Sequence, residues 1–109
     1  GFHWYSIYPS PPAAAYTVDN DASASATDAF VYAGGVTVGA ISLRSDSTMD
    51  DVTMDAAGEV LTYGPIVSSN GNRYGFTWIA LPTETATPTT FNFSGVSEGG
   101  NKAIASWVS

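Results

Sequence analysis

The stretch Arg73 to Leu81, RYGFTWIAL, decides the fold class of this chain. Successive side chains of a β-strand point to opposite faces, so Tyr74, Phe76 and Trp78 fall together on one face of an extended segment. Large apolar residues at every second position indicate a strand with one side in a hydrophobic core. An amphipathic helix would instead repeat its apolar residues every three to four positions.

Turn signals upstream of this strand predict two tight connections. Asn70-Gly71 separates Ile66–Ser68 from the aromatic strand, and Asn-Gly supplies the positive φ angles that a two-residue hairpin turn requires. Asp55–Gly58 has the polar start and the glycine end of another tight turn. The first feature predicts a β-hairpin, and the second predicts a tight turn between two strands that are neighbours in sequence.

The segment 36–43 predicts a further strand with an irregularity. Apolar residues alternate from Val36 to Ala40, and the phase then shifts to Ile41 and Leu43. Because a phase shift beside a glycine is typical of an extra residue in one strand, we expect a β-bulge at Gly39.

The whole chain predicts an all-β domain. Pro82 ends the aromatic strand, and the Thr/Pro-rich residues after it predict a connection that crosses between sheets. Short strands with turn signals about every 8 to 12 residues are typical of an antiparallel β-sandwich, either immunoglobulin-like or a jelly roll. We expect this domain over residues 13–109, with strands at 16–18, 30–32, 36–43, 50–54, 59–63, 66–68, 73–81, 91–96 and 102–108.

Length and charge exclude several function classes. The 109 residues suit one domain, and their net charge is -7 with only three basic residues, which are scattered. Nucleic acid is therefore not an expected partner, because binding it requires clustered Lys and Arg. Without an apolar run of about 20 residues, the chain is not expected to insert into a membrane. The absence of cysteine excludes disulfides and thiolate chemistry.

The first twelve residues, GFHWYSIYPSPP, predict an extended arm. Prolines at positions 9, 11 and 12 fix φ and exclude the start of a helix. The arm is either an edge strand that covers one end of its own core or a segment that docks on a neighbouring subunit, because so many large apolar groups are unfavourable in water. The residues proposed for assembly are Phe2, Trp4, Tyr5, Ile7 and Tyr8.

Signals for catalysis are weak. The single histidine, His3, lies in the aromatic arm, distant in sequence from any acid that could orient it, and the chain has no G-x-S-x-G motif. A thin sandwich also leaves little room for a deep cleft that would raise the pKa of one of two paired carboxyls. We expect a non-enzymatic protein without a cofactor.

Acidic residues gather at two points of the sequence. Asp46, Asp50, Asp51 and Asp55 fall close together, and Asp19–Asp21 forms a second oxygen-rich point. Calcium requires six to eight oxygen ligands, so loops at one end of a sandwich could hold it, but EF-hand spacing is missing. The favoured alternative is a set of solvated acids that keep the surface soluble and the strand edges unpaired. We therefore assign no metal site.

Three tryptophans raise the question of carbohydrate binding. Trp78 and Trp107 lie on expected strands and are assigned to packing, whereas Trp4 remains open, so a glycan is an alternative ligand. The triplet Asn92-Phe93-Ser94 meets the glycosylation pattern but falls inside an expected strand, and we do not assign it as an acceptor.

The half of the chain from Asp50 to Ser109 resembles immunoglobulin-like sandwich modules of phage virion and bacterial surface proteins. The resemblance lies in its strands and turns, including RYGFTWIAL, TFNFSGVS and KAIASWVS, and not in the Cys-Trp-Cys pattern of antibody domains. A small acidic domain with an aromatic arm is similar to the decoration or cement proteins of bacteriophage capsids. This resemblance implies a structural protein on a virion or extracellular surface, with self, capsid or fibre subunits as partners and oligomers as a frequent state. An adhesive or carbohydrate-binding module of a secreted protein, tail fibre or pilus is the alternative.

Overall fold

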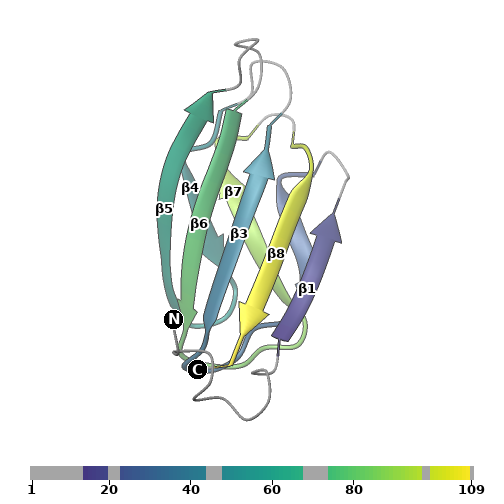
Figure 1. Ribbon diagram of the computed structural model, residues 1–109, viewed down its shortest axis with the longest axis vertical. Coiled ribbons are helices and arrows are strands. Elements are labelled where there is room, and N and C mark those ends of the chain that lie inside the picture. Colours follow the sequence, from purple (N-terminus) through teal and green to yellow (C-terminus); the bar gives the residue numbers. More distant parts are fainter. Residues whose placement is uncertain (1–13, 20–22, 44–47, 68–73, 97–98, 109) are drawn as a thin grey trace, which may run out of the picture.

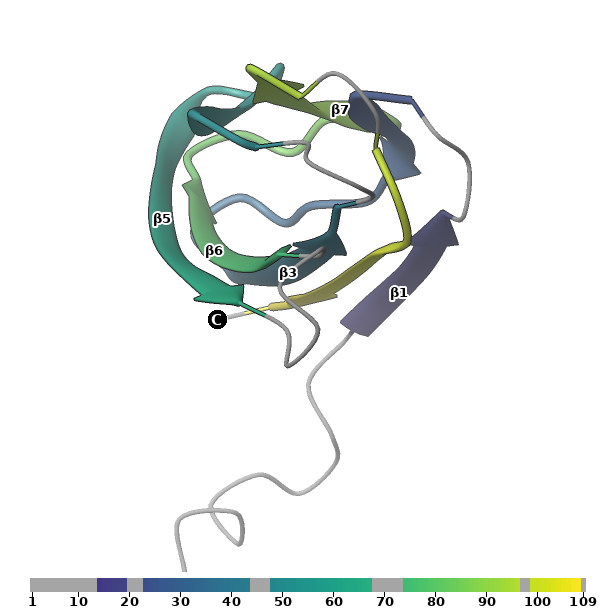
Figure 2. The same cartoon turned by 90° about the horizontal axis from the view of Figure 1, so that it is seen from above.

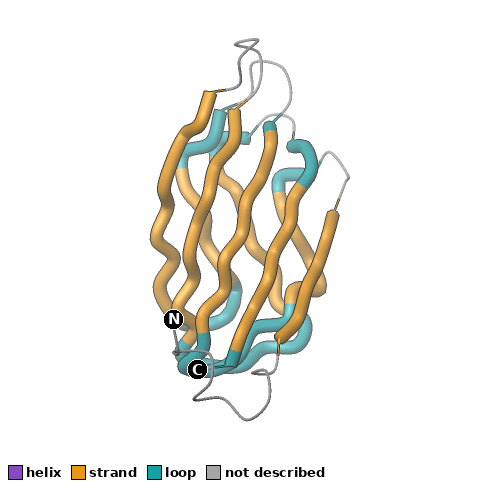
Figure 3. Tube along the Cα trace, in the orientation of Figure 1, coloured by secondary structure: helices purple, strands orange, loops and turns teal. Residues whose placement is uncertain are grey.

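The computed structural model describes residues 14–19, 23–43, 48–67, 74–96 and 99–108, with backbone alone for 14–19, 65–67 and 74. These residues form two antiparallel β-sheets packed face to face, which confirms the predicted β-sandwich (Figures 1 and 2). Strands joined by loops make up the described part of the chain, where no helix is long and apolar enough to cross a membrane (Figure 3). The strands are β1 (Ala14–Asp19), β2 (Ser25–Ala29), β3 (Val36–Ser42), β4 (Asp51–Met54), β5 (Gly58–Val67), β6 (Tyr74–Pro82), β7 (Thr89–Ser94) and β8 (Lys102–Trp107).

The strand order is that of a jelly roll, except that β5 pairs with β6 in the larger sheet and not with β4. A five-stranded sheet has the order β1-β8-β3-β6-β5, and a three-stranded sheet has the order β2-β7-β4. Strand pairs are nested around the β4–β5 turn, β3 with β6, β2 with β7 and β1 with β8, and successive pairs alternate between the sheets. An immunoglobulin sandwich would instead place its first two strands in one sheet. Of the two predicted arrangements, the chain adopts the second.

The core is centred on Trp78 of β6. Its side chain is fully buried, and its ring centroid lies 6.0 Å from that of Phe91 and 5.3 Å from that of Phe93, both on β7 in the opposite sheet. The predicted alternation of the aromatic strand is confirmed, since Phe76 and Ala80 are also buried. These contacts join the two sheets across the sandwich.

The predicted bulge at Gly39 is absent, and the alternating residues Val36, Val38 and Ala40 lie on the outward face of β3. Thr37, Gly39 and Ile41 are the buried positions, while β3 pairs in continuous register with β6 and β8. The reason is Trp78, because a Cβ at residue 39 would overlap the Cζ2, Cε2 and Cη2 atoms of its indole. Gly39 therefore provides space for an aromatic ring in the core.

The strand expected at Phe30–Tyr32 is displaced to Ser25–Ala29. Ala26 lies opposite Phe91 in the pairing of β2 with β7, and both are fully buried, so a small side chain is needed beside the large ring. Phe30 and Tyr32 follow the strand, and their ring centroids lie 4.9 Å apart. An apolar run of three residues here belongs to a loop.

The other predicted connections agree with the structure. Residues 55–57 join β4 to β5, and the pairing of Val67 with Tyr74 confirms the β5–β6 hairpin, although Asn70-Gly71 lies outside the described residues. The two strands expected at 59–63 and 66–68 are one ten-residue strand, β5, whose register shifts between Tyr63 and Ile66.

One buried hydrogen bond ties β3 to β8 and gives a test of the inward register. The hydroxyls of Thr37 and Ser106 lie 2.8 Å apart, and both residues are nearly inaccessible. Thr37→Val should lower the free energy of unfolding by about 1–3 kcal/mol, because it leaves the Ser106 hydroxyl buried without a partner. Thr37→Val/Ser106→Ala should be more stable than Thr37→Val in urea unfolding. A double variant that is less stable than the single one would contradict this assignment.

Candidate functional site

The outer faces of the two sheets differ in polarity. On the three-stranded sheet, the side chains that point away from the core are polar, as at Thr53, Asn92 and Ser94, all of which are exposed. Antiparallel sheets with one solvated face normally have this composition. The three-stranded sheet therefore has the outer face of a sheet that meets water.

The outer face of the five-stranded sheet is apolar. Its inward positions are fixed by Trp78, Gly39 and Ile104, so the alternate residues and their cross-strand partners point outward. Among the described side chains on this face, Glu59 is the charged one. The outer face consists mainly of Val36, Val38 and Ala40 on β3, Leu61 and Tyr63 on β5, Thr77, Ile79 and Leu81 on β6, and Ala103, Ala105 and Trp107 on β8.

Several of these side chains are large and accessible. The exposed fractions are 52% for Tyr63, 41% for Leu81 and 37% for both Leu61 and Trp107. They lie on β5, β6 and β8, with the smaller apolar residues of β3 between them. A contiguous apolar patch of this kind marks an interaction surface, whereas single exposed apolar residues do not.

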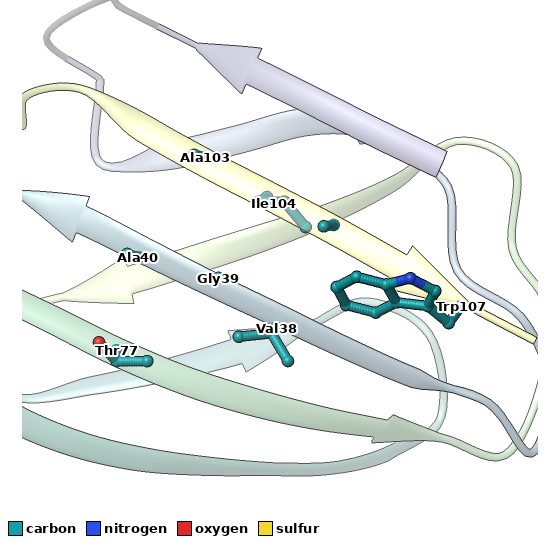
Figure 4. Close-up of a pocket in the computed structure, with 8 residues that line it drawn as sticks. Val38, Gly39, Ala40, Thr77, Ala103, Ile104 and Trp107 are labelled. Carbon is teal, nitrogen blue, oxygen red and sulfur yellow. The ribbon is translucent and has the colours of Figure 1, made fainter. Parts of the chain in front are cut away.

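A shallow groove of about 200 Å³ lies within this outer face (Figure 4). It follows β3 and β8, where Ala40 pairs with Ala103 and Val38 with Ala105. The indole of Trp107 lies at one end of the groove, and Thr77 of β6 lies on the side of β3 away from β8 (Figure 4). Because alanines form the floor, the groove has room for a large side chain supplied by another segment.

Trp107 corrects a prediction from the sequence. It lies on the last strand, as expected, but on the outward face, opposite Val36 in the β3–β8 register. Trp78 and Trp107 therefore have different surroundings, the first fully buried and the second more than one-third exposed. Their positions along the strands separate them. Trp78 lies opposite the inward residue Gly39, whereas Trp107 is an odd number of residues from the inward residue Ile104 and so points the other way.

A second hollow, of about 370 Å³, lies between β4 and β5 and has a more polar lining. It includes Asp51 and Glu59, which are both exposed. General acid catalysis by paired carboxyls depends on one acid being withdrawn from water, and both of these side chains are exposed. This hollow has no buried acid among its lining residues.

The acids considered for calcium do not gather within the described residues. The Oδ1 atom of Asp51 accepts a hydrogen bond from the backbone N–H of Val52, and that of Asp55 accepts one from Asn92 Nδ2 at 3.2 Å. No group of three potential metal ligands occurs among the residues that the structure describes. Asp46 and residues 20–21 lie outside them, and so does the side chain of Asp19.

The arm lies outside the described residues, including the proposed assembly residues Phe2, Trp4, Tyr5, Ile7 and Tyr8, together with His3. Asn92 of the glycosylation triplet lies within β7, as the sequence predicted. Comparison with known proteins adds no relative, because no family model, no curated protein and no solved structure matches this chain.

Proposed function

We propose that this chain is a non-enzymatic structural subunit that assembles with further copies of itself through the outer face of the five-stranded sheet. The observation that carries this proposal is the contrast between the two outer faces of one sandwich. Both sheets are antiparallel, yet among the described side chains the outer face is polar on the three-stranded sheet and mainly apolar on the five-stranded sheet. An apolar outer face is favourable when a partner covers it.

The proposed setting is a virion or another extracellular surface, where the subunit would decorate a capsid or fibre. A small acidic domain with an aromatic arm resembles such decoration proteins, and jelly rolls occur in viral capsid and lectin domains. A fold alone does not determine function, so this setting rests on the resemblance and not on the strand order.

The self-assembly proposal is tested by placing a charge on each outer face in turn. Ala105→Glu puts a carboxylate in the groove, and an unpaired charge buried in an interface costs about 3–5 kcal/mol, which is a loss of roughly 100-fold or more in affinity. Thr53→Glu adds the same charge to the polar sheet and serves as the matched control. Light scattering should give a multiple of 11.3 kDa for the wild-type chain and for Thr53→Glu, and 11.3 kDa for Ala105→Glu.

Two controls make the result decisive. The melting temperature of Ala105→Glu should stay close to that of the wild-type chain, because residue 105 points away from the core. Ala105→Lys should also dissociate the oligomer, which separates burial of a charge from repulsion between acidic subunits. A wild-type chain that remains a monomer at every concentration at which it stays dissolved would overturn the proposal.

Carbohydrate binding is a second candidate, favoured by the exposed indole of Trp107 in the groove. A sugar also needs hydrogen bonds to its hydroxyls, and Thr77 is the one side chain of the lining with a hydroxyl, amide or charged group. The groove therefore suits an apolar occupant better than a glycan. Trp107→Ala should leave glycan-array binding unchanged, and a glycan signal that disappears in this variant would favour the second candidate.

A further inference from the structure

We propose that the groove on the outer face receives the aromatic arm, residues 1–12, of a second copy of this chain. This inference rests on the proposed self-assembly through the outer face, and it names the segment that the face binds. Copies would then be joined by an exchange of arms, with each domain offering one groove and one arm.

The arm is joined to the domain close to the groove. Residues 1–13 precede β1, whose first residue, Ala14, pairs with Trp107 of β8. Trp107 also lines the groove, so the arm connects to the sheet at the end of the groove where this indole lies. An arm that reaches out from this point brings its apolar residues to the outer face of an adjacent copy by a short path.

The arm is also long enough to bridge two copies. An extended chain spans at most about 3.3–3.6 Å per residue, so residues 1–12 reach about 40 Å. Along β8 the groove runs from Ala103 to Trp107, a distance of about 13 Å at strand spacing. The apolar segment Phe2–Tyr8 therefore has the length to fill a neighbouring groove while the remaining residues cross the gap between the domains.

The prolines favour a second copy over the chain's own groove. Pro9, Pro11 and Pro12 fix φ next to β1, and proline-rich segments act as stiff spacers with a rise of about 3.1 Å per residue. At this rise, a stiff segment that joins residue 8 to residue 14 would span roughly 15–20 Å. The groove between β3 and β8 lies only one to two strand spacings from β1, about 5–10 Å. A stiff spacer of this length would hold the aromatic residues beyond the groove of their own domain, which favours the groove of a second copy.

Charge points to the same pairing. The chain has a net charge of -7, so copies repel one another over most of their surface. Residues 1–12 contain no Asp, Glu, Lys or Arg, and the groove is lined by uncharged residues. Binding of the arm in the groove therefore brings no acidic residues together. It also buries apolar surface on both sides.

The test is complementation between two full-length variants. Trp4→Ser/Ile7→Ser weakens the arm and leaves the groove intact, whereas Ala105→Glu blocks the groove and leaves the arm intact. Each variant alone should have a mass of 11.3 kDa by light scattering. An equimolar mixture should contain a heterodimer of twice that mass, because one intact arm meets one intact groove. The heterodimer should be weaker than the wild-type oligomer, since reciprocal exchange provides two contacts and the mixture provides one.

The outcomes separate this inference from the proposed function. If the arm variant remains an oligomer while Ala105→Glu is a monomer, the face assembles without the arm and arm exchange is overturned. A mixture in which both variants stay monomeric also overturns it. A wild-type chain that never assembles removes the proposed function as well. Ala103→Lys is the second groove variant, used in the same mixture if Ala105→Glu shows a lowered melting temperature.

Discussion

Replacing Trp78 by alanine is expected to lower the free energy of unfolding by about 3–5 kcal/mol, the largest effect of any single substitution considered for this chain. Trp78 is fully buried on β6 and contacts Phe91 and Phe93 across the sandwich. Its removal leaves a cavity between the two sheets. The backbone cannot move far enough to fill this cavity, because each sheet is held in shape by its own ladder of hydrogen bonds. Natural domains are stable by only about 5–15 kcal/mol, so the variant should be close to unfolding.

The measurement is urea unfolding followed by fluorescence and far-UV circular dichroism. Trp107→Ala is the matched control, since it removes the same side chain from the outward face of the five-stranded sheet. In the Ala105→Glu background, in which the chain is expected to stay monomeric, we expect it to cost about 1 kcal/mol or less, in the range of substitutions away from the core. If the two substitutions lower the free energy of unfolding by the same amount, the division of the sheet into an inward and an outward face would be wrong.

Most of the fold was predictable because local signals agreed with the tertiary structure. The alternation of RYGFTWIAL and the turn at Asp55–Gly58 both depend on residues that are neighbours in sequence, and both predictions are confirmed. The strand order was not predictable, since an immunoglobulin sandwich and a jelly roll use the same short strands and turns. Pairings between strands far apart in the sequence, β1 with β8 and β2 with β7, separate the two.

Two of the predictions that failed concern small residues. Ala26 and Gly39 carry little hydrophobic signal, yet both are inward positions whose small size makes room for Phe91 and Trp78. Periodicity gives weight to large side chains, so the change from Val36, Val38 and Ala40 to Ile41 and Leu43 was interpreted as a bulge, whereas β3 is regular and has Gly39 facing inward. It also treated the outer side of each strand as the solvent side, so the apolar outer face was not foreseen. Its signal was present in the apolar residues Ile79 and Leu81, which fall on the opposite phase from Trp78.

Gly39→Ala is expected to cost about 3 kcal/mol, at the upper end of the range for overpacked cores. The added Cβ would lie closer than 3.0 Å to three atoms of the Trp78 ring, which real Cβ atoms essentially never do. The ring has little freedom to move, because Phe91 and Phe93 pack against it from the other sheet. Ala40→Ser, the control on the exposed side of the same strand, should change stability by no more than about 0.5 kcal/mol.

A double-mutant cycle identifies Trp78 as the obstacle. Trp78→Phe removes the outer part of the indole that the new Cβ would meet, and it also removes the Nε1–H, which is buried with no hydrogen-bond partner in the described part of the chain. In the Trp78→Phe background, Gly39→Ala should therefore cost less than about 1 kcal/mol, which gives a coupling of about 2 kcal/mol between the two sites. Additive costs would mean that the backbone of β3, and not the indole, requires glycine. A coupling of the expected size would establish that the Trp78 ring on the neighbouring strand requires glycine at position 39. The same ring would then determine which face of β3 points outward, toward a partner.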